Sequence, residues 1–146
     1  MQNKDTFVSC QLCEKTIALK PQISNSCDFC GWRQHLNYNE NPDSVIFPNR
    51  VSFNRAIELV KQGKPLIPTL DDFAQMVKYN LHAEFFYKSR HYGVLDGHGN
   101  DIEFYEMSIE EGYQSYPTID EFKEKAHIGG KLLKDIWHEV VDADYM

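Results

Sequence analysis

The stretch that decides the fold of the N-terminal part is Ser9–Trp32, which reads SCQLCEKTIALKPQISNSCDFCGW. It contains all four cysteines of the chain as two Cys-x-x-Cys pairs, Cys10 with Cys13 and Cys27 with Cys30, separated by thirteen residues. Two residues between cysteines let a tight turn direct both thiolates to one metal ion, and two such turns complete a tetrahedron. The spacing therefore predicts one zinc ion. Because four protein ligands leave no open position, we expect this zinc to be structural.

A redox function is the competing interpretation of a Cys-x-x-Cys pair. A thioredoxin-like disulfide uses a single pair within a βαβ unit. Here both pairs lie in one short stretch that has no sustained helical or strand period. The pattern therefore favours a metal-nucleated lobe with short hairpins, which we place at residues 1–47.

The composition is typical of a folded globular protein. Of the 146 residues, 42% are hydrophobic and 13% aromatic, too apolar for a disordered chain. No apolar run approaches the roughly 20 residues that a membrane span needs. The first residues, Met1–Asp5, lack the basic-then-apolar order of a secretory signal. Since paired cysteines without disulfides fit a reducing compartment, we expect a cytoplasmic protein without membrane contact.

The net charge of −7 is distributed unevenly along the chain. Residues 1–68 carry eight Lys and Arg against six Asp and Glu, whereas residues 69–146 carry seven against sixteen. Because the field of a protein steers its partners by sign, the C-terminal half should repel phosphate backbones and attract basic surfaces.

Hydrophobic periodicity and turn signals predict an α+β fold. A helix should begin at Ser52 and stop at Gly63 and Pro65, and a second should begin at Thr69. Period-two patterns predict three antiparallel strands, joined by short turns. The three strands are expected at 84–87, 91–95 and 102–107. Two more helices are expected after them, a capped helix from Thr118 to Ala126 and a last amphipathic helix at 131–141.

These elements predict two parts. Residues 1–47 would form a zinc-ribbon-like lobe packed on helices and a small antiparallel β-sheet made by residues 48–146. No Gly/Ser/Pro-rich linker separates the parts, so we expect them to share one core.

No residue pattern indicates catalysis. His98, in the segment Asp96-Gly-His-Gly-Asn100, could form an acid–base pair with Asp96. A hairpin turn needs the same glycines and asparagine, however, and the sequence contains neither a nucleophilic triad nor a glycine-rich phosphate loop. We therefore expect a protein that is not an enzyme.

The sequence is compatible with two kinds of partner, a nucleic acid or a basic protein. Zinc ribbons often bind nucleic acid, and Lys15, Lys20, Arg33, Arg50 and Arg55 could offer a modest basic patch. The acidic balance of the whole chain argues against nucleic acid, which leaves that function as the alternative. The stronger feature is a cluster of acids that is either a solvated strand face or a docking surface for a basic protein: Asp101, Glu103, Glu106, Glu110 and Glu111.

Two segments resemble known bacterial families. Cys27-Asp-Phe-Cys30-Gly-Trp32, Asn41-Pro-Asp43 and Asn49-Arg-Val-Ser-Phe-Asn-Arg-Ala56 are similar to a cysteine-rich family with an adjacent Cys-Pro-Cys-Cys knuckle. Here that first knuckle is Cys10-Gln-Leu-Cys13, and Arg33-Gln34-His35 replaces the acidic run of the family.

Residues 84–140 resemble a small domain of bacterial toxin–immunity loci, with an aromatic hairpin, a helix and the ending Ile128-Gly-Gly-Lys-Leu-Leu-Lys-Asp-Ile-Trp137. The resemblance implies an immunity protein for a polymorphic or contact-dependent growth-inhibition toxin. Such proteins are acidic, non-enzymatic and cytosolic, and they cover the active site of a basic toxin nuclease.

Overall fold

The computed structural model describes residues 6–19, 26–35, 40–97 and 101–146. His98 lies outside the described residues. The chain divides into two units, residues 1–67 and residues 68–146. The sequence suggested a boundary after residue 47, but the structure places the first helix in the N-terminal unit. The fold class is α+β, as the sequence predicts.

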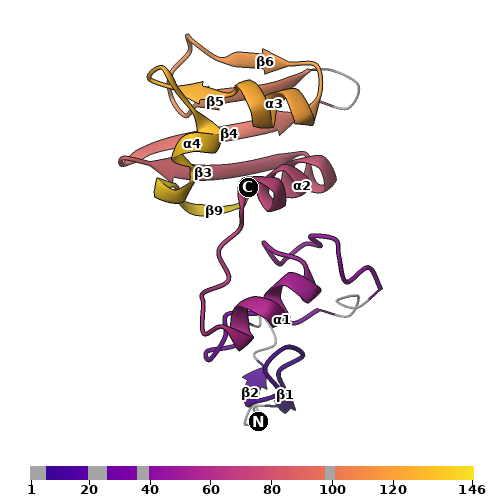
Figure 1. The fold of residues 1–146 in the computed structure, drawn as a ribbon. Coiled ribbons are helices and arrows are strands. Elements are labelled where there is room, and N and C mark those ends of the chain that lie inside the picture. The colour runs from indigo at the N-terminus through magenta and orange to yellow at the C-terminus, as the bar shows by residue number, and fades with distance from the viewer. Residues whose placement is uncertain (1–5, 20–25, 36–39, 98–100) are drawn as a thin grey trace, which may run out of the picture. The chain divides into compact units, whose positions relative to one another are not determined.

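The N-terminal unit begins with a hairpin of β1 (Thr6–Ser9) and β2 (Thr16–Leu19), which pair antiparallel. Its helix is α1 (Phe53–Lys61), and both are visible in Figure 1. Ser52 caps α1 because its hydroxyl accepts a hydrogen bond from the backbone N–H of Arg55, which satisfies one of the free donors of the first turn.

The core of the N-terminal unit is built around two of the cysteines. Buried side chains from β2, from the segment after the second cysteine pair, and from α1 and its flanks form one cluster with them: Ile17, Trp32, Val51, Ala56 and Leu66, together with Cys10 and Cys27. Trp32 packs edge-on against Phe53 of α1, with ring centroids 5.5 Å apart. The helix thus belongs to the cysteine lobe because its apolar face covers the side chains next to the sulfur atoms.

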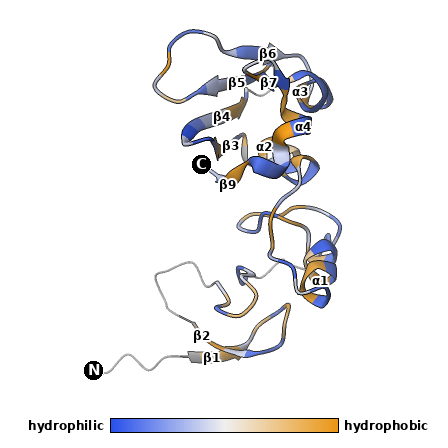
Figure 2. Cartoon of the chain, turned by 60° about the vertical axis from the view of Figure 1, so that its left-hand side comes forward, coloured by the Kyte–Doolittle hydropathy of each residue, from blue (hydrophilic) through white to orange (hydrophobic). Residues whose placement is uncertain are grey.

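The C-terminal unit contains a five-stranded sheet in the order β6-β5-β4-β3-β9, in which every neighbouring pair is antiparallel. Its helices lie on one side of this sheet in both views of the chain (Figures 1 and 2). The bounds of the elements are β3 His82–Tyr87, β4 Arg90–Asp96, β5 Ile102–Glu106, β6 Gln114–Tyr116, β9 Val141–Tyr145, α2 Leu70–Asn80, α3 Ile119–Lys125 and α4 Leu133–Ile136.

An aromatic core holds the helices against the sheet. Phe85 of β3 lies 5.5 Å from the ring of Phe73 of α2 and 5.5 Å from that of Trp137, and Phe104 of β5 lies 5.7 Å from Phe122 of α3. Edge-on and tilted ring contacts add to the burial of large apolar area. Since all these rings come from residues 68–146, this unit has a core of its own.

Capping residues start both longer helices of this unit where the sequence predicts them. Thr69 forms a reciprocal capping box with Asp72 at the start of α2, and Thr118 accepts from the backbone N–H of Glu121 at the start of α3.

The prediction of one helix over residues 131–141 is wrong. Gly129 and Gly130 adopt φ values of +57° and +80°, and they turn the chain between β7 (His127–Ile128) and β8 (Lys131–Leu132). Only α4 and a 3₁₀ helix (η1, Trp137–Glu139) follow. The chain then extends as β9, whose backbone groups pair with the edge of β3.

Among the described residues, no helix is long and apolar enough to cross a membrane.

Candidate metal centre

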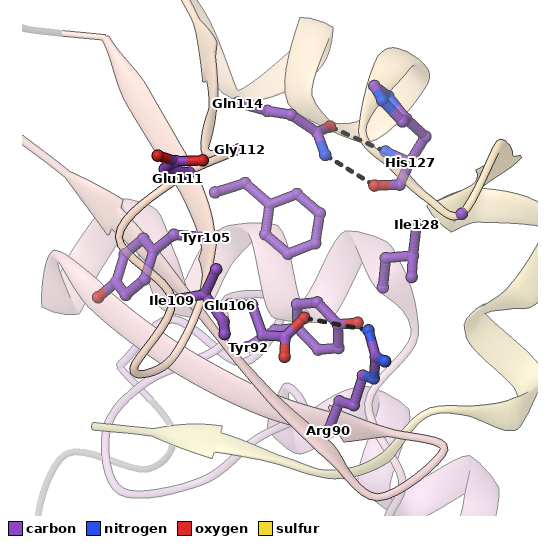
Figure 3. Close-up of a pocket in the computed structure, with 12 residues that line it drawn as sticks. Arg90, Tyr92, Tyr105, Glu106, Ile109, Glu111, Gly112, Gln114, His127 and Ile128 are labelled. Atoms are coloured by element: carbon purple, nitrogen blue, oxygen red, sulfur yellow. Dashed lines mark hydrogen bonds and ion pairs between the residues drawn. The ribbon is translucent and has the colours of Figure 1, made fainter.

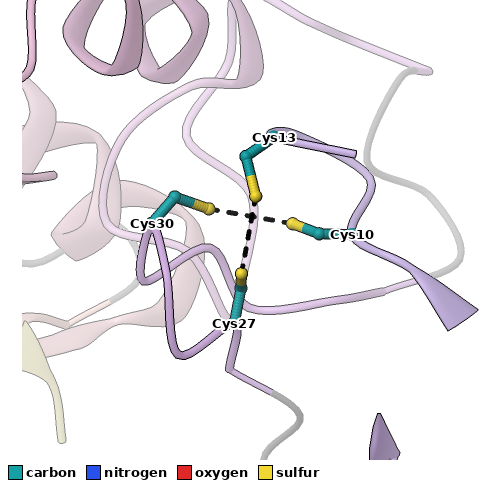
Figure 4. Close-up of side chains that lie close together, drawn as sticks. All are labelled: Cys10, Cys13, Cys27 and Cys30. Carbon is teal, nitrogen blue, oxygen red and sulfur yellow. Dashed lines mark hydrogen bonds between the residues drawn. The ribbon is translucent and has the colours of Figure 1, made fainter. Parts of the chain in front are cut away.

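The four cysteine sulfur atoms point toward one another (Figure 4). The Sγ atoms of Cys10 and Cys30 are 3.7 Å apart, those of Cys13 and Cys27 are 3.6 Å apart, and all four lie within 4.8 Å of one another. A disulfide needs about 2.05 Å between sulfurs, and all four cysteines are free thiols. The structure therefore brings together the predicted ligands as a group that could hold one metal ion.

The spacing of the sulfurs fits a tetrahedral thiolate site. A zinc–sulfur distance of about 2.3 Å in a regular tetrahedron corresponds to about 3.8 Å between ligand sulfurs. The two measured separations, 3.7 and 3.6 Å, are close to this edge. Because all four positions are occupied by cysteine, a metal ion here would have no open position for substrate.

The two cysteine turns have the same backbone geometry. The N–H of Cys10 donates to the carbonyl of Lys15 and that of Cys27 to the carbonyl of Trp32, each at 2.8 Å. The residue after each pair, Glu14 or Gly31, has a positive φ of +65° or +82°. Gly31 meets this need without strain because glycine has no Cβ atom. Glu14 holds the equivalent position in the first turn although a side chain disfavours it.

Hydrogen bonds point at the sulfur of the first cysteine in each turn. The backbone N–H of Leu12 donates to Cys10 Sγ and that of Phe29 to Cys27 Sγ, both at 3.4 Å. Such bonds stabilise a thiolate more than a thiol.

A second layer of polar side chains, not foreseen from the sequence, ties the two turns together. Gln34 donates from Nε2 to Cys10 Sγ at 3.3 Å and accepts at Oε1 from the N–H of Gln11 at 2.9 Å. Gln11 Oε1 in turn accepts from the indole N–H of Trp32 at 3.2 Å. Partners of this kind orient metal ligands. In the sequence, Gln11 lies within the first pair and Gln34 four residues after the second, and glutamines at such positions are too common to indicate a contact with sulfur.

The surroundings favour ionisation of one thiol and oppose that of two others. Burial raises the pKa of Cys30 and of Cys13, and hydrogen bonds with neighbouring sulfurs raise it further. For Cys10, burial opposes ionisation, but the backbone N–H groups at Cys13 and Leu12 and the amide of Gln34 prevail and lower the pKa to about 7. The site therefore favours a thiolate at Cys10, and a bound divalent cation would stabilise the thiolate forms of Cys13 and Cys30.

Of the histidines in the described residues, none joins the cysteine group. His35 is nearest in sequence, and its ring lies 6.0 Å from that of Trp32, where burial lowers its pKa. His91 instead bonds Glu84, Nε2 to Oε2 at 2.7 Å, in the C-terminal unit.

The five predicted partner-binding acids do not share one surface. Strand alternation places Glu103 and Glu106, three residues apart, on opposite faces of β5. Glu106 is on the helix side, opposite Tyr92, and its carboxylate lies 3.5 Å from Nη1 of Arg90. Asp101 precedes β5 and accepts from Ser115 at 3.0 Å, and Glu110 and Glu111 lie exposed in the segment before β6. Closeness in sequence therefore did not produce one docking patch.

A hollow of about 290 Å³ lies beside Glu106 (Figure 3). Four of its lining residues bond to one another in pairs. Arg90 contacts Glu106, and the side-chain amide of Gln114 bonds both backbone groups of His127, at 2.7 and 3.0 Å. These bonds join β4 to β5 and the start of β6 to β7, and they account for the polar groups of Arg90, Glu106 and Gln114 in the hollow.

Comparison with protein-family models, with curated proteins and with solved structures finds no match to this chain. The two family resemblances seen in the sequence therefore stay predictions.

Proposed function

We propose that this chain is a non-enzymatic protein-binding module, stabilised by one structural zinc ion, that binds a basic protein. The form implied by the resemblance is an immunity protein in the bacterial cytoplasm that masks a cognate toxin nuclease. The observation that supports protein binding is the side of the five-stranded sheet opposite α2, α3 and α4, called here the open sheet face.

The open sheet face carries acids from three different strands and no Lys or Arg from any strand. Register places its members from β3, β4, β5 and β9 side by side, because cross-strand partners project to the same side. Within the described part of residues 68–146, no helix covers it. Its side chains include His82, Glu84 and Phe86 of β3, His91 and Leu95 of β4, Glu103 and Tyr105 of β5, Ser115 of β6, and Val141 and Asp144 of β9.

The face is ordered by its own contacts. The rings of Phe86 and His91 stack with centroids 4.3 Å apart and planes 8° from parallel, and His91 also bonds Glu84. A Cβ atom at Gly93 would lie 2.9 Å from the ring of Tyr105, so this ring lies directly over the glycine backbone. Little side-chain entropy is left to lose when a partner binds, which favours affinity.

Negative charge is concentrated around the tyrosine at the centre of the face. Burial, and then the nearby carboxylates of Glu103 and Glu84, raise the pKa of Tyr105. A basic partner would find acceptors and an aromatic ring together, a combination that serves both association rate and anchoring.

The test uses the protein encoded immediately beside this chain's gene, purified with its catalytic residue replaced. We expect an equimolar complex, and protection of cells from the active toxin by co-expression. Glu103→Lys should weaken binding at least about tenfold, with less effect in high salt, because screening reduces charge attraction.

Glu139→Lys is the matched control. It makes the same charge change at an exposed residue of η1, which is not on the open sheet face. It should leave affinity within about twofold. Equal losses for the two variants, or no complex with the neighbouring protein, would contradict the proposal.

A further inference from the structure

A hollow of about 540 Å³ lies beside the second cysteine turn, within the N-terminal unit. Its walls come from the tip of that turn, from Arg50 before α1, and from the end of α1 and the segment after it. The lining residues on which the argument rests are Phe29, Arg50, Val60, Lys64 and Leu66.

The hollow is basic and apolar. Arg50 and Lys64 line it, no Asp or Glu does, and Val60 and Leu66 supply apolar surface. Arg50 is half-buried, and its side chain makes no hydrogen bond or ion pair within the described residues. A guanidinium held partly out of water without a carboxylate partner favours an anionic ligand.

A flat aromatic ring stands at the edge of this hollow. Phe29, between the two cysteines of the second turn, is 62% exposed, although its backbone N–H is fixed by the bond to Cys27 Sγ. The ammonium group of Lys15 lies 4.7 Å from the centroid of this ring. The second cysteine turn therefore presents an exposed ring on a hydrogen-bonded backbone, with the ammonium group of Lys15 close to that ring and Arg50 and Lys64 lining the same hollow.

We propose that this hollow binds single-stranded nucleic acid, with a base stacked on Phe29 and backbone phosphates at Arg50 and Lys64. Stacking on exposed aromatic rings combined with a cationic groove is how sequence-tolerant single-strand binding works. An acidic peptide would use the two cations but would gain less from a flat exposed ring.

The negative charge of the whole chain does not oppose this site. Charges farther apart than about 8–10 Å are largely screened at physiological salt. The lining holds two cationic side chains, Arg50 and Lys64, and no carboxylate. Its Cys30 belongs to the metal cluster, whose four thiolates and one zinc ion together carry a charge of −2. The cations would therefore hold a phosphate by direct contact, and the salt dependence of binding measures that contact.

The experiment measures fluorescence anisotropy of a labelled ten-nucleotide oligo-uridine RNA with the full zinc-loaded chain, between 50 and 200 mM salt. Phe29→Ala should weaken binding by about 5- to 150-fold, the range for losing one stacked base. Replacing Arg50 and Lys64 by alanine should reduce the slope of log affinity against log salt by about 1.4, the value for two phosphate contacts on a single strand.

Two variants serve as controls. Phe7→Ala removes another exposed phenylalanine, 66% accessible and in β1, and should leave affinity unchanged. Lys61→Ala removes an exposed cation of α1 that does not line the hollow, and should leave affinity within about twofold. Zinc content confirms that each variant is folded. The proposal is overturned by no RNA binding, by equal effects of Phe29→Ala and Phe7→Ala, or by binding of a labelled acidic peptide in place of RNA.

Discussion

Replacing Cys27 by serine should unfold the N-terminal unit. Cys27 is buried, and its sulfur is 3.6 Å from that of Cys13, so the change removes one corner of the cluster. Structural zinc contributes about 10 kcal/mol or more to folding of small modules, and a whole domain is stable by only about 5–15 kcal/mol. The free energy lost with the zinc ion is therefore as large as the whole free energy of unfolding of a domain. We expect zinc content to fall from one per chain to none.

The two tryptophans report on the two units separately. Trp32 is 1% exposed and packs in the cysteine core, whereas Trp137 packs on Phe73 and Phe85 and donates to the carbonyl of Pro68 at 2.9 Å. In an NMR spectrum of the indole N–H groups, Cys27→Ser or a strong chelator should move the Trp32 signal to its unfolded position. The Trp137 signal should stay, because its core contains no cysteine.

Ser26→Ala is the matched control for this experiment, since it changes the neighbouring exposed residue and no ligand. It should retain one zinc and both native signals. The reasoning fails if the metal-free chain keeps Trp32 in its native position. It also fails if both tryptophan signals shift together, because that result would mean that the two units do not have separate cores.

Two further predictions concern the cysteine turns. The apparent affinity for zinc, measured by competition with a chromophoric chelator, should change at least about 100-fold for each pH unit near neutrality. It should increase as the pH is raised and decrease as the pH is lowered. The raised pKa values of Cys13 and Cys30 keep at least these two thiols protonated in the metal-free protein, so zinc binding must release both protons. A slope of one or less for log affinity against pH would contradict this reasoning. Gly31→Ala should destabilise the N-terminal unit by about 1 kcal/mol and Glu14→Gly should stabilise it by about as much, since both residues have a positive φ. Chemical denaturation of the zinc-loaded chain checks both, and a loss of stability in Glu14→Gly would refute the equivalence of the two turns.

Features that depend on neighbours in sequence could be predicted. Ser52, Thr69 and Thr118 begin helices in the structure because a capping hydroxyl needs only the backbone two or three residues ahead. The cysteine cluster belongs to the same class. Each turn is fixed by its own two-residue spacing, and only the meeting of the two turns is long-range.

The sequence does not predict features that depend on which part of the chain an apolar helix face packs against. The sequence predicts the helix that begins at Ser52, but it does not say that Ala56 packs in the cysteine core. The expected boundary after residue 47 therefore differs from the division after residue 67 in the structure. Likewise Leu133, Ile136 and Trp137 have helical spacing. The structure uses them in one short helix and a 3₁₀ helix before the chain joins the sheet as β9.

The acidic surface shows why the two kinds of site differ in predictability. A metal site made by two short turns depends on the spacing of its ligands along the chain. A sheet face depends on whether each residue has an odd or even position in its strand and on how the strands are paired. Glu106 is close to Glu103 in sequence but faces the helices, because three residues reverse the side of a strand. Glu84 and Asp144 are far apart in sequence but are paired across β3 and β9. A face of this kind is defined only once the last strand is placed, and the chain places that strand after a segment that resembles a helix.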